Sequence, residues 1–569
     1  MSRHFLKMAT ATALSAGLVL SASACSSSGG SKAKSQPTSA PVATLNEVNA
    51  QPVSSLKQGG TLNWPEDQWS TQWNNLNASS QNEESIQQTM ASMMPSLFVS
   101  TADNKLSPNP DYLSSVTNTM VGGKQVTTYN INPKAHWSDG TPITWKDFQI
   151  NWQVQNGSNP KYSSVANGTG YSQISSVVEG TSPTQAVVTY SAPFADWQSL
   201  FSLLYPGEEM STPAKFNSAY LNAIPVTAGP FKLGSLNATT KVVTVVRDPN
   251  WWGTKPVLDS INFRSMDDSA MPGAFASGEI DLEDIGPDVA EYKQALQVKG
   301  TSIRVAGGPN LRQLLLNGAS PMLTDEKVRQ AVFLAINRQA IGEADLSGMP
   351  WPIKPLNNHF LVNNAAGYQD NSAGLGDFDP SKASALLAAA GWTKGSGQYL
   401  TKGGKTLELR LAIPSGVSTA TTEAQAMTAM LANVGIKVDT QVDDTDDFFN
   451  DVSAGSFDMT IFSGLGAIPF FPLTNSQASF QSPVKGNIGQ NYSRIGSPSI
   501  DALMVKAGTE QTNSAYIADI NAADAQLWQL AVNLPLYQRP ELEATNPKLA
   551  NWGAFGFATT DYTKIGWMK

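Results

Sequence analysis

Asp325–Arg338, with the sequence DEKVRQAVFLAINR, decides the fold class because it predicts an amphipathic helix within an alternating series of strands and helices. Thr324 and Asp325 offer a capped helix start. Apolar residues then recur at helical spacing and form one face. The members of this face are Val328, Ala331, Val332, Ala335 and Ile336.

Outward from this helix, the chain alternates between strand-like and helix-like runs. The strand-like run Gln313–Asn317 precedes it, and four further runs follow in the order helix, strand, helix, strand. These runs are Pro380–Ala390, Leu407–Ile413, Thr422–Val434 and Val438–Val442. The alternation predicts an α/β domain with an at least partly parallel sheet.

The part of the chain before this helix has a different residue pattern. Residues 98–226 form a block of short β-like runs separated by turn residues, notably Gln125–Asn132 and Gln185–Tyr190. Val242–Arg247, VVTVVR, is the densest β-branched run and predicts a central strand. The chain has 569 residues, of which 41% are hydrophobic and 15% are charged, so we expect two or three globular domains.

Charge and composition limit the classes of partner that we expect for this protein. The formal net charge is −9, and no Lys/Arg cluster has interleaved aromatics, so nucleic acid is not an expected partner. Fourteen Trp residues favour a binding cleft, although the same residues suit a core.

The N-terminus predicts export. Arg3, His4 and Lys7 form a positive region, Met8–Leu20 is apolar, and small residues lead to Cys25, so residues 1–24 are typical of a signal peptide. The apolar stretch is short for a membrane span, and no later stretch approaches about eighteen consecutive apolar residues, so a polytopic protein is not expected.

Cys25 is the only cysteine, so it cannot form an internal disulfide. Its position after Ala22-Ser23-Ala24 resembles the lipobox of bacterial lipoproteins, except that Ala22 stands where Leu is usual. The resemblance implies lipidation of Cys25, with an unmodified secreted protein as the alternative. Residues 25–56 are rich in Ser, Gly, Ala, Pro and Thr and predict a flexible tether.

The sequence offers little material for catalysis or metal binding. After the signal peptide only His136 and His359 remain as histidines, so a His/Cys zinc site or a Cys-His nucleophile is not expected. A Ser-His-Asp triad is formally possible, but no G-x-S-x-G elbow follows a strand-like run. Paired carboxylates stay open, because sequence spacing cannot show which of them face each other.

Phe457–Pro472, FDMTIFSGLGAIPFFP, is uncharged after Asp458, rich in aromatics, and interrupted by Gly and Pro. It predicts a buried strand that runs into an irregular loop. If the protein holds a ligand, we expect it against this stretch. The alternative is a core strand with an apolar loop.

Seven groups of stretches, in order along nearly all of the chain after Gly59, resemble the extracytoplasmic solute-binding proteins of ABC importers for oligopeptides, dipeptides and nickel. Tyr129–Trp152 is similar to the family's strand and F-S-D-G-x-P-x-T-A-x-D-V motif. The other groups are residues 226–231, 247–252, 276–281, 316–317 with 325–338, 378–387, and 533–537. Within the first stretch, Ser138–Pro142 predicts a structural turn, in which Asp139 bonds backbone amides.

The resemblance implies an α/β bilobed periplasmic-binding-protein fold of type II, the three-part oligopeptide-binding type, with hinge-linked lobes and an inserted small β-rich domain. We expect the first lobe at residues 57–97, 225–308 and 538–569, the insertion at 98–224, and the second lobe at 309–537. The lobes would close on a peptide or peptide-like solute and deliver it to an ABC permease and its ATPase subunits. The expected protein is a monomer without cofactor, metal or catalysis, held at the cell membrane by lipid on Cys25.

One part of the family pattern is missing. In peptide-binding members, the strand after F-D leads to an Asp that pairs with the α-ammonium group of the peptide. That position falls on Ala467, and two neighbouring family positions fall on Ile461 and Gly464. Met459–Ser476 contains no charged residue, so capture of a free amino terminus through this strand is not expected. A blocked, cyclic or modified peptide, or a non-peptide solute, would fit instead.

The candidate lining combines aromatic, amide and small residues with one cation. For each aromatic the alternative is core packing, and Arg312 would either meet a ligand carboxylate or lie on a surface strand. The residues are Trp69, Trp73, Asn310, Arg312, Trp351, Phe462, Gly464, Ala467, Phe470 and Asn491. Two further functions stay open: an extracellular hydrolase with paired carboxylates in a Trp-lined cleft, and a receptor for a peptide signal without nutritional import.

Overall fold

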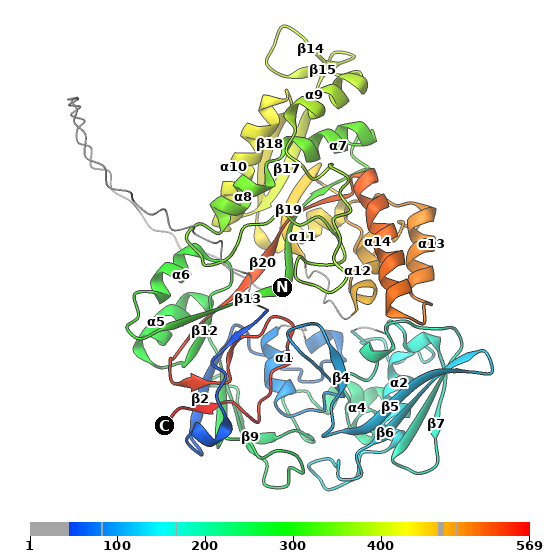
Figure 1. The fold of residues 1–569 in the computed structure, drawn as a ribbon, viewed down its shortest axis with the longest axis vertical. Coiled ribbons are helices and arrows are strands. Elements are labelled where there is room, and N and C mark those ends of the chain that lie inside the picture. The colour runs from blue at the N-terminus through cyan, green and yellow to red at the C-terminus, as the bar shows by residue number, and fades with distance from the viewer. Residues whose placement is uncertain (1–44, 81–83, 167, 465–470, 485–486) are drawn as a thin grey trace, which may run out of the picture.

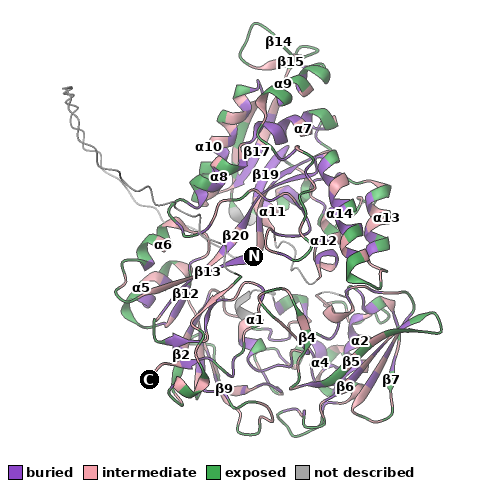
Figure 2. Cartoon of the chain, in the orientation of Figure 1, coloured by how far each residue is buried: buried purple, intermediate pink, exposed green. Residues whose placement is uncertain are grey.

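The computed structural model describes residues 45–80, 84–166, 168–464, 471–484 and 487–569. Figure 1 shows two lobes, one above the other, with the C-terminus in the lower lobe. The bilobed α/β fold predicted from the sequence is confirmed. The strands of both lobes are largely buried, whereas the helices expose their outer faces (Figure 2).

The lower lobe is built from three separated parts of the chain. Its four-stranded sheet has the order β2-β11-β10-β9, in which β2 and β11 are parallel. The strands are β2 (Thr61–Glu66), β9 (Phe231–Asn237), β10 (Val242–Arg247) and β11 (Ser260–Ser265). β10 has the predicted bounds, and it lies inside the sheet as expected for its β-branched residues.

Aromatic contacts join the three parts of this lobe. Trp64 of β2 packs on Phe263 of β11, and its ring also contacts Trp552 and Tyr562 near the C-terminus. Because these rings come from distant positions in the sequence, the C-terminal segment completes the core of the lobe. The remaining elements here are α1 (Glu84–Ala91), β1 (Glu47–Val48), β21 (Leu549–Ala550), β22 (Gly553–Ala554) and β23 (Gly566–Trp567). The buried residues of α5 (Met271–Ser277) and α6 (Val289–Ala295) belong to the apolar core of the upper lobe.

A β-rich subdomain lies beside this lobe. Its antiparallel sheet has the order β5-β6-β8-β7. The elements of the subdomain are β3 (Phe98–Ser100), β4 (Leu106–Pro108), β5 (Leu113–Val121), β6 (Lys124–Ile131), α2 (Trp145–Gln155), β7 (Ile174–Glu179), β8 (Gln185–Tyr190), α3 (Gly207–Met210) and α4 (Pro213–Ser218).

The predicted turn before α2 is present. The backbone N–H of Thr141 donates to Asp139 Oδ1 over 2.8 Å, and Gly140 has a φ of 89°, which favours glycine. α2 then starts with a capping box between Thr144 and Asp147. The motif is therefore a structural strand-turn-helix joint.

The upper lobe contains a six-stranded mixed sheet of order β12-β20-β13-β19-β17-β18. β17 runs parallel to both β18 and β19, as the alternating sequence predicts. The strands are β12 (Leu282–Asp284), β13 (Ser302–Leu316), β17 (Glu408–Pro414), β18 (Lys437–Asp443), β19 (Met459–Gly464) and β20 (Asn533–Thr545). A small three-stranded sheet consists of β14 (Thr393–Lys394), β15 (Leu400–Lys402) and β16 (Lys405–Thr406).

The helices of this lobe differ from the sequence prediction at one place. The predicted single helix over residues 325–338 is wrong, because Ile336 is extended and the Asn337 side chain caps a second helix. The predicted apolar face is nevertheless buried. The helices are α7 (Glu326–Ala335), α8 (Arg338–Asp345), α9 (Pro380–Ala389), α10 (Ser418–Asn433), α11 (Thr445–Ala454), α12 (Pro472–Phe480), α13 (Pro498–Ala507) and α14 (Asn513–Leu530).

The predicted tether reaches too far along the chain. Residues 1–44 lie outside the described part, but β1 pairs with β22, and Leu56 is 1% exposed against Val257 and Ala550. Strand pairing and burial of Leu56 therefore make residues 47–56 part of the folded body. Cys25 and the predicted signal peptide lie outside the described residues.

Candidate functional site

The two long strands β13 and β20 run between the lobes, and their pairing is irregular where they cross. Gly307 pairs with Pro540 and Leu311 pairs with Gln538, so Gly308, Pro309 and Asn310 of β13 all lie opposite the single residue Arg539. Such a register shift bends the strand and re-aims side chains. The predicted lobe boundaries at residues 308/309 and 537/538 fall at this place.

Polar side chains brace the shifted segment from one side. Gln538 Nε2 donates to the Gly308 carbonyl over 2.8 Å and to Asn364 Oδ1 over 2.7 Å. Trp351 packs so closely that a Cβ on Gly307 would lie 3.0 Å from its ring, which requires a small residue at that position. Residues 307–311 of β13 are thus held in place without regular backbone hydrogen bonding to β20.

Asn310 carries a hydrogen-bond acceptor that is buried and has no partner among the described residues, its Oδ1 atom. An unsatisfied buried oxygen of this kind costs free energy unless a ligand or water supplies a donor. Asn310 and Trp351, both predicted as lining residues, are therefore placed around the same crossing of β13 and β20.

Arg312 is paired within the protein. Its Nε donates to Glu423 Oε1 over 2.7 Å, its second terminal nitrogen donates to Glu423 Oε2, and its remaining nitrogen reaches Ser463 Oγ at 3.4 Å. Burial alone would lower the pKa of Arg312, but the charge and hydrogen bonds of Glu423 raise it above its ordinary value. The interpretation of Arg312 as a surface residue is wrong, because its side chain is 11% exposed.

A second carboxylate belongs to this cluster. Tyr537 Oη donates to Asp345 Oδ2 over 2.9 Å. Burial and then the negative charge of Glu423 raise the pKa of Asp345, which favours its neutral form. The internal charges of Arg312 and Glu423 consequently balance each other.

Phe462 lies on the other face of the sheet. Arg312 pairs with Ser463 and Gln313 pairs with Phe462, and successive strand residues point to opposite faces. The Phe462 ring contacts Phe449 and Tyr492, with centroids 5.7 and 6.2 Å away. Gly464 ends β19 opposite Leu311, where a Cβ would lie 2.7 Å from Gln313 Nε2.

The remaining predicted lining residues are scattered. Trp69 and Trp73 contact each other edge to face at 5.7 Å against the core of the lower lobe, where Trp73 is 3% exposed. Asn491 is buried and donates to the carbonyls of Gln481 and Ile495, so it braces a loop. Ala467 and Phe470 lie outside the described residues.

The lobes also meet away from the crossing strands. Asp196 of the subdomain accepts hydrogen bonds from the backbone N–H and the hydroxyl of Thr474, at 3.0 and 2.6 Å. The backbone N–H of Ala195 donates to the Gly508 carbonyl over 2.8 Å. Asn104 Nδ2 donates to the Asn364 carbonyl over 3.3 Å. The subdomain and the upper lobe are therefore in direct contact in this structure.

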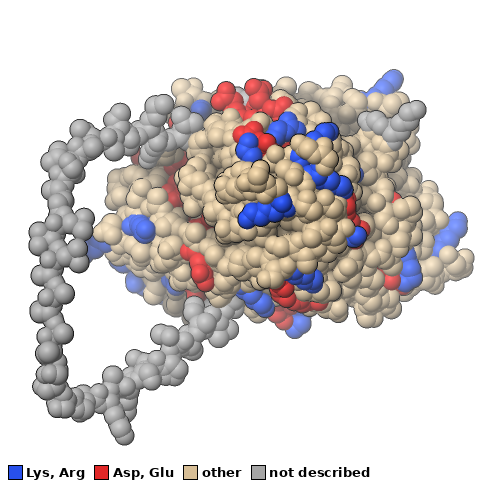
Figure 3. Space-filling model, turned by 90° about the horizontal axis from the view of Figure 1, so that it is seen from above, with Lys and Arg blue, Asp and Glu red and all other residues tan. Residues whose placement is uncertain are grey.

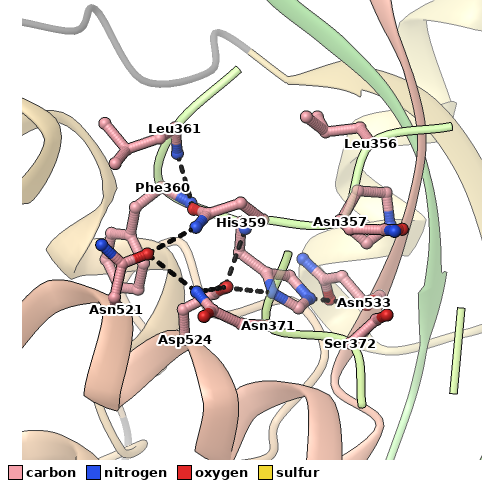
Figure 4. A network of polar contacts seen from close by, with 12 residues as sticks. Leu356, Asn357, His359, Phe360, Leu361, Asn371, Ser372, Asn521, Asp524 and Asn533 are labelled. Carbon is pink, nitrogen blue, oxygen red and sulfur yellow. Dashed lines mark hydrogen bonds and ion pairs between the residues drawn. The ribbon is translucent and has the colours of Figure 1, made fainter. Parts of the chain in front are cut away.

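A buried histidine and aspartate form the centre of a network within the upper lobe (Figure 4). His359 Nδ1 lies 2.6 Å from Asp524 Oδ1, and Nε2 lies 2.7 Å from the Asn533 carbonyl. Because a carbonyl only accepts, Nε2 carries a proton and is not free to act on a serine. Asn371 also donates to Asp524, so the network ties the loop before α9 to α14.

Two further properties concern the described part as a whole. Its residues include no group of three or more His, Cys, Asp and Glu side chains arranged to hold a metal ion. None of its helices combines the length and apolar character that a membrane crossing requires. Seen from above, its surface carries acidic and basic side chains among many uncharged ones (Figure 3).

Sequence reasoning missed Arg539, Glu423, Gln538 and Asp196. Arg539 follows the apolar run Leu534-Pro535-Leu536-Tyr537, but the same strand also contains Glu541 and Glu543, so its charge alone does not single it out in the sequence. The other three gain their importance from partners that are far away in the sequence.

Comparisons with known proteins agree with this architecture. The model of the bacterial extracellular solute-binding proteins, family 5 Middle, matches residues 107–487. Oligopeptide-binding protein OppA of Mycobacterium tuberculosis (strain ATCC 25618 / H37Rv) is 34% identical over 553 residues, covering 96% of this chain and 91% of that protein.

Two solved structures share the fold. A periplasmic EDTA-binding protein, EppA, superimposes with a TM-score of 0.83 and 25% identity over 92% of this chain and 98% of that one. The oligopeptide-binding protein AppA from Bacillus subtilis, in complex with a nonapeptide, gives a TM-score of 0.71 and 18% identity over 90% and 100% of the two chains.

Proposed function

The chain belongs to the bacterial extracellular solute-binding proteins of family 5, and on this premise we propose that it captures a peptide or peptide-like solute between its lobes for an ABC permease. Its relative OppA is named an oligopeptide-binding protein, and AppA was solved with a nonapeptide. Solute that bridges both lobes would stabilise the closed form, which a permease can recognise.

The observation that carries this proposal is the crossing of β13 and β20. There the pairing breaks, Asn310 Oδ1 is buried without a partner, and the strands pass from one lobe to the other. Polar groups without partners at the joint between two lobes suit a ligand that satisfies them on closure.

The proposal is tested by ligand-dependent stability. Purified protein is stripped of co-purifying solute by partial unfolding and refolding, and its melting temperature is measured with and without a tryptic digest of casein. A solute receptor gains about 3 kcal/mol at a ligand concentration near 100 times Kd. No shift with the digest, and no small molecule in the material released on unfolding, would refute peptide capture.

Lipidation of Cys25 is a second part of the proposal. An acylated Cys25 with a tether of about 20 residues would hold the body near its permease and raise their effective concentration. Cys25→Ser should release the protein into the culture medium, whereas wild type stays with the membrane fraction. Equal release of both proteins contradicts anchoring.

We propose no catalytic role. The family and the compared relatives are binding proteins. The negative charge of Glu423 adds to burial in raising the pKa of Asp345, but Glu423 has no exposed side-chain surface and both its oxygens bind Arg312. A pair occupied in this way is poorly placed to attack a sugar polymer. A peptide-signal receptor differs in that its response survives deletion of the permease genes.

A further inference from the structure

The guanidinium of Arg539 is the feature of this site that the protein leaves uncompensated. Arg539 lies in β20 opposite the three residues Gly308, Pro309 and Asn310, where the ladder with β13 is interrupted. Neither the hydrogen bonds nor the ion pairs of the described residues include its side chain, although neighbouring Arg312 is fully paired with Glu423.

The surroundings of Arg539 are enclosed. Burial lowers the pKa of its guanidinium, and the like charge of Arg312 lowers it too, while Tyr537, Asp284 and Glu423 act in the opposite direction. The residue nevertheless keeps intermediate exposure. The side chain of Arg539 is therefore partly desolvated by the protein and still reachable by solvent.

The carboxylates in this region are engaged by other groups. Glu423 is committed to Arg312 by both of its oxygens, and Asp345 favours its neutral form. Asp284 accepts from the backbone N–H of Gly286, and its negative charge raises the pKa of Arg539 without a direct bond to the guanidinium being part of the hydrogen-bond network described above. Arg539 is therefore influenced by nearby carboxylates, but its guanidinium takes part in none of the ion pairs of the described residues.

An unpaired, partly desolvated cation is costly to keep in a folded protein. Its planar set of donors matches a carboxylate, which it can bind through two parallel hydrogen bonds. Asn310 Oδ1, on the strand segment facing Arg539, offers an acceptor that also has no partner and suits an N–H group of a solute.

We propose that Arg539 binds a carboxylate of the solute at the crossing of β13 and β20, so that the protein selects acidic solutes. The inference rests on the proposed function and deepens it, because it names the chemical group that the site takes. It also fits the absence of charged residues in Met459–Ser476, which offers no partner for a cationic group. The carboxylate has three possible sources: a peptide C-terminus, an acidic peptide side chain, or a polycarboxylate chelator.

The test compares wild type with Arg539→Gln and with Arg264→Gln. The control removes the same charge from an exposed ion pair with Glu279 in the lower lobe. Four probes are titrated by calorimetry into solute-free protein: pools of N-acetylated tripeptides with a free carboxyl end, the same pools as neutral C-terminal amides, amides that contain one Asp or Glu, and EDTA.

The expected result is that wild type and Arg264→Gln prefer one of the carboxylate probes over the neutral amides. Arg539→Gln should weaken that probe by about 30-fold or more and leave the neutral amides unchanged, because it removes only the ionic partner. Which of the three carboxylate probes shows the effect identifies the source of the carboxylate.

Two results overturn the inference separately from the proposed function. If wild type binds the neutral amides as tightly as the acidic probes, and Arg539→Gln changes nothing, peptide capture stands and the role of Arg539 is refuted. If no peptide pool binds wild type, peptide capture is refuted. Binding of EDTA to wild type that is lost in Arg539→Gln then still supports the carboxylate site. If none of the probes binds wild type, both the proposed function and the carboxylate site are refuted.

Stability supplies a second readout that a purely structural arginine would not give. If Arg539 supported the fold, its substitution would destabilise the protein. If Arg539 is an unpaired cation, solute-free Arg539→Gln should have a melting temperature no lower than that of wild type. A marked fall in the melting temperature of solute-free Arg539→Gln, together with unchanged carboxylate binding, contradicts the proposal.

Discussion

Removal of Asp196 should open the protein. Asp196 is 4% exposed and lies in the subdomain, yet its Oδ2 accepts from the backbone N–H and hydroxyl of Thr474 in the upper lobe. Thr474 is the third residue of α12, so its N–H is one of the first-turn amides that the helix itself leaves unsatisfied. Asp196 thus caps a helix of the other lobe, and it can do so only when the lobes are closed.

The two contacts with Thr474 set the free energy by which Asp196 favours closure of the lobes. A hydrogen bond to a charged group contributes about 1.5–3 kcal/mol, and water replaces part of it in the open form. Burial raises the pKa of Asp196, and the hydrogen bonds from Thr474 and Tyr516 counter this only in part, so desolvation reduces the gain further. A net value of about 2 kcal/mol corresponds to roughly 30-fold in the closing equilibrium.

The assay uses Asp196→Ala with Asp103→Ala as a matched control, since Asp103 is an exposed carboxylate of the same subdomain. Calorimetry with the casein digest should show binding about 30-fold weaker for Asp196→Ala and unchanged for the control, and X-ray scattering should show a larger radius of gyration. A double-mutant cycle with Thr474→Val should give a coupling of about 1 kcal/mol. Equal affinity and scattering for both alanine variants would refute the reasoning.

Three further substitutions test the electrostatics and packing. Burial, Glu291 and Asp284 raise the pKa of Glu283 to about 7, so ionisation of Glu283 opposes folding increasingly between about pH 4.5 and 7. The unfolding free energy of Glu283→Gln should equal that of wild type at pH 4 and exceed it by about 1–3 kcal/mol at pH 8. An equal difference at both pH values contradicts this. His359→Ala should cost about 3 kcal/mol or more in urea unfolding because it leaves Asp524 buried without its ring partner, and a loss below about 1 kcal/mol would show that the network is dispensable. Glu423→Gln should destabilise by about 2–4 kcal/mol because Arg312 loses its counter-charge, and wild-type stability in guanidinium titrations would contradict the pairing.

Local elements were predictable from the sequence where one periodicity dominates. Val242–Arg247 and Gln185–Tyr190 match strands β10 and β8, because β-branched and alternating residues favour strands. The helix predicted over residues 325–338 is split, since Asn337 can cap a new helix as easily as it can continue the old one. Composition alone could not show that residues 47–56 pair with the distant C-terminal segment.

The candidate site was predictable only in part. Asn310, Arg312 and Trp351 do lie around the crossing strands. The register shift that isolates Arg539, and the pairing of Arg312 with Glu423, depend on strand register and on helix placement across 111 residues of sequence. No sequence spacing encodes such contacts.

Closure upon solute binding is measured most directly by a distance between the subdomain and the upper lobe. Cys25 is the only cysteine, so in a Cys25→Ser background Val121→Cys and Val505→Cys introduce unique labels at exposed positions of β5 and α13. Electron–electron distance measurements should give a longer, broader distribution without solute, and a shorter, narrow one with the carboxylate-bearing peptide pool. Identical distributions in the presence and absence of bound solute would contradict capture by closure.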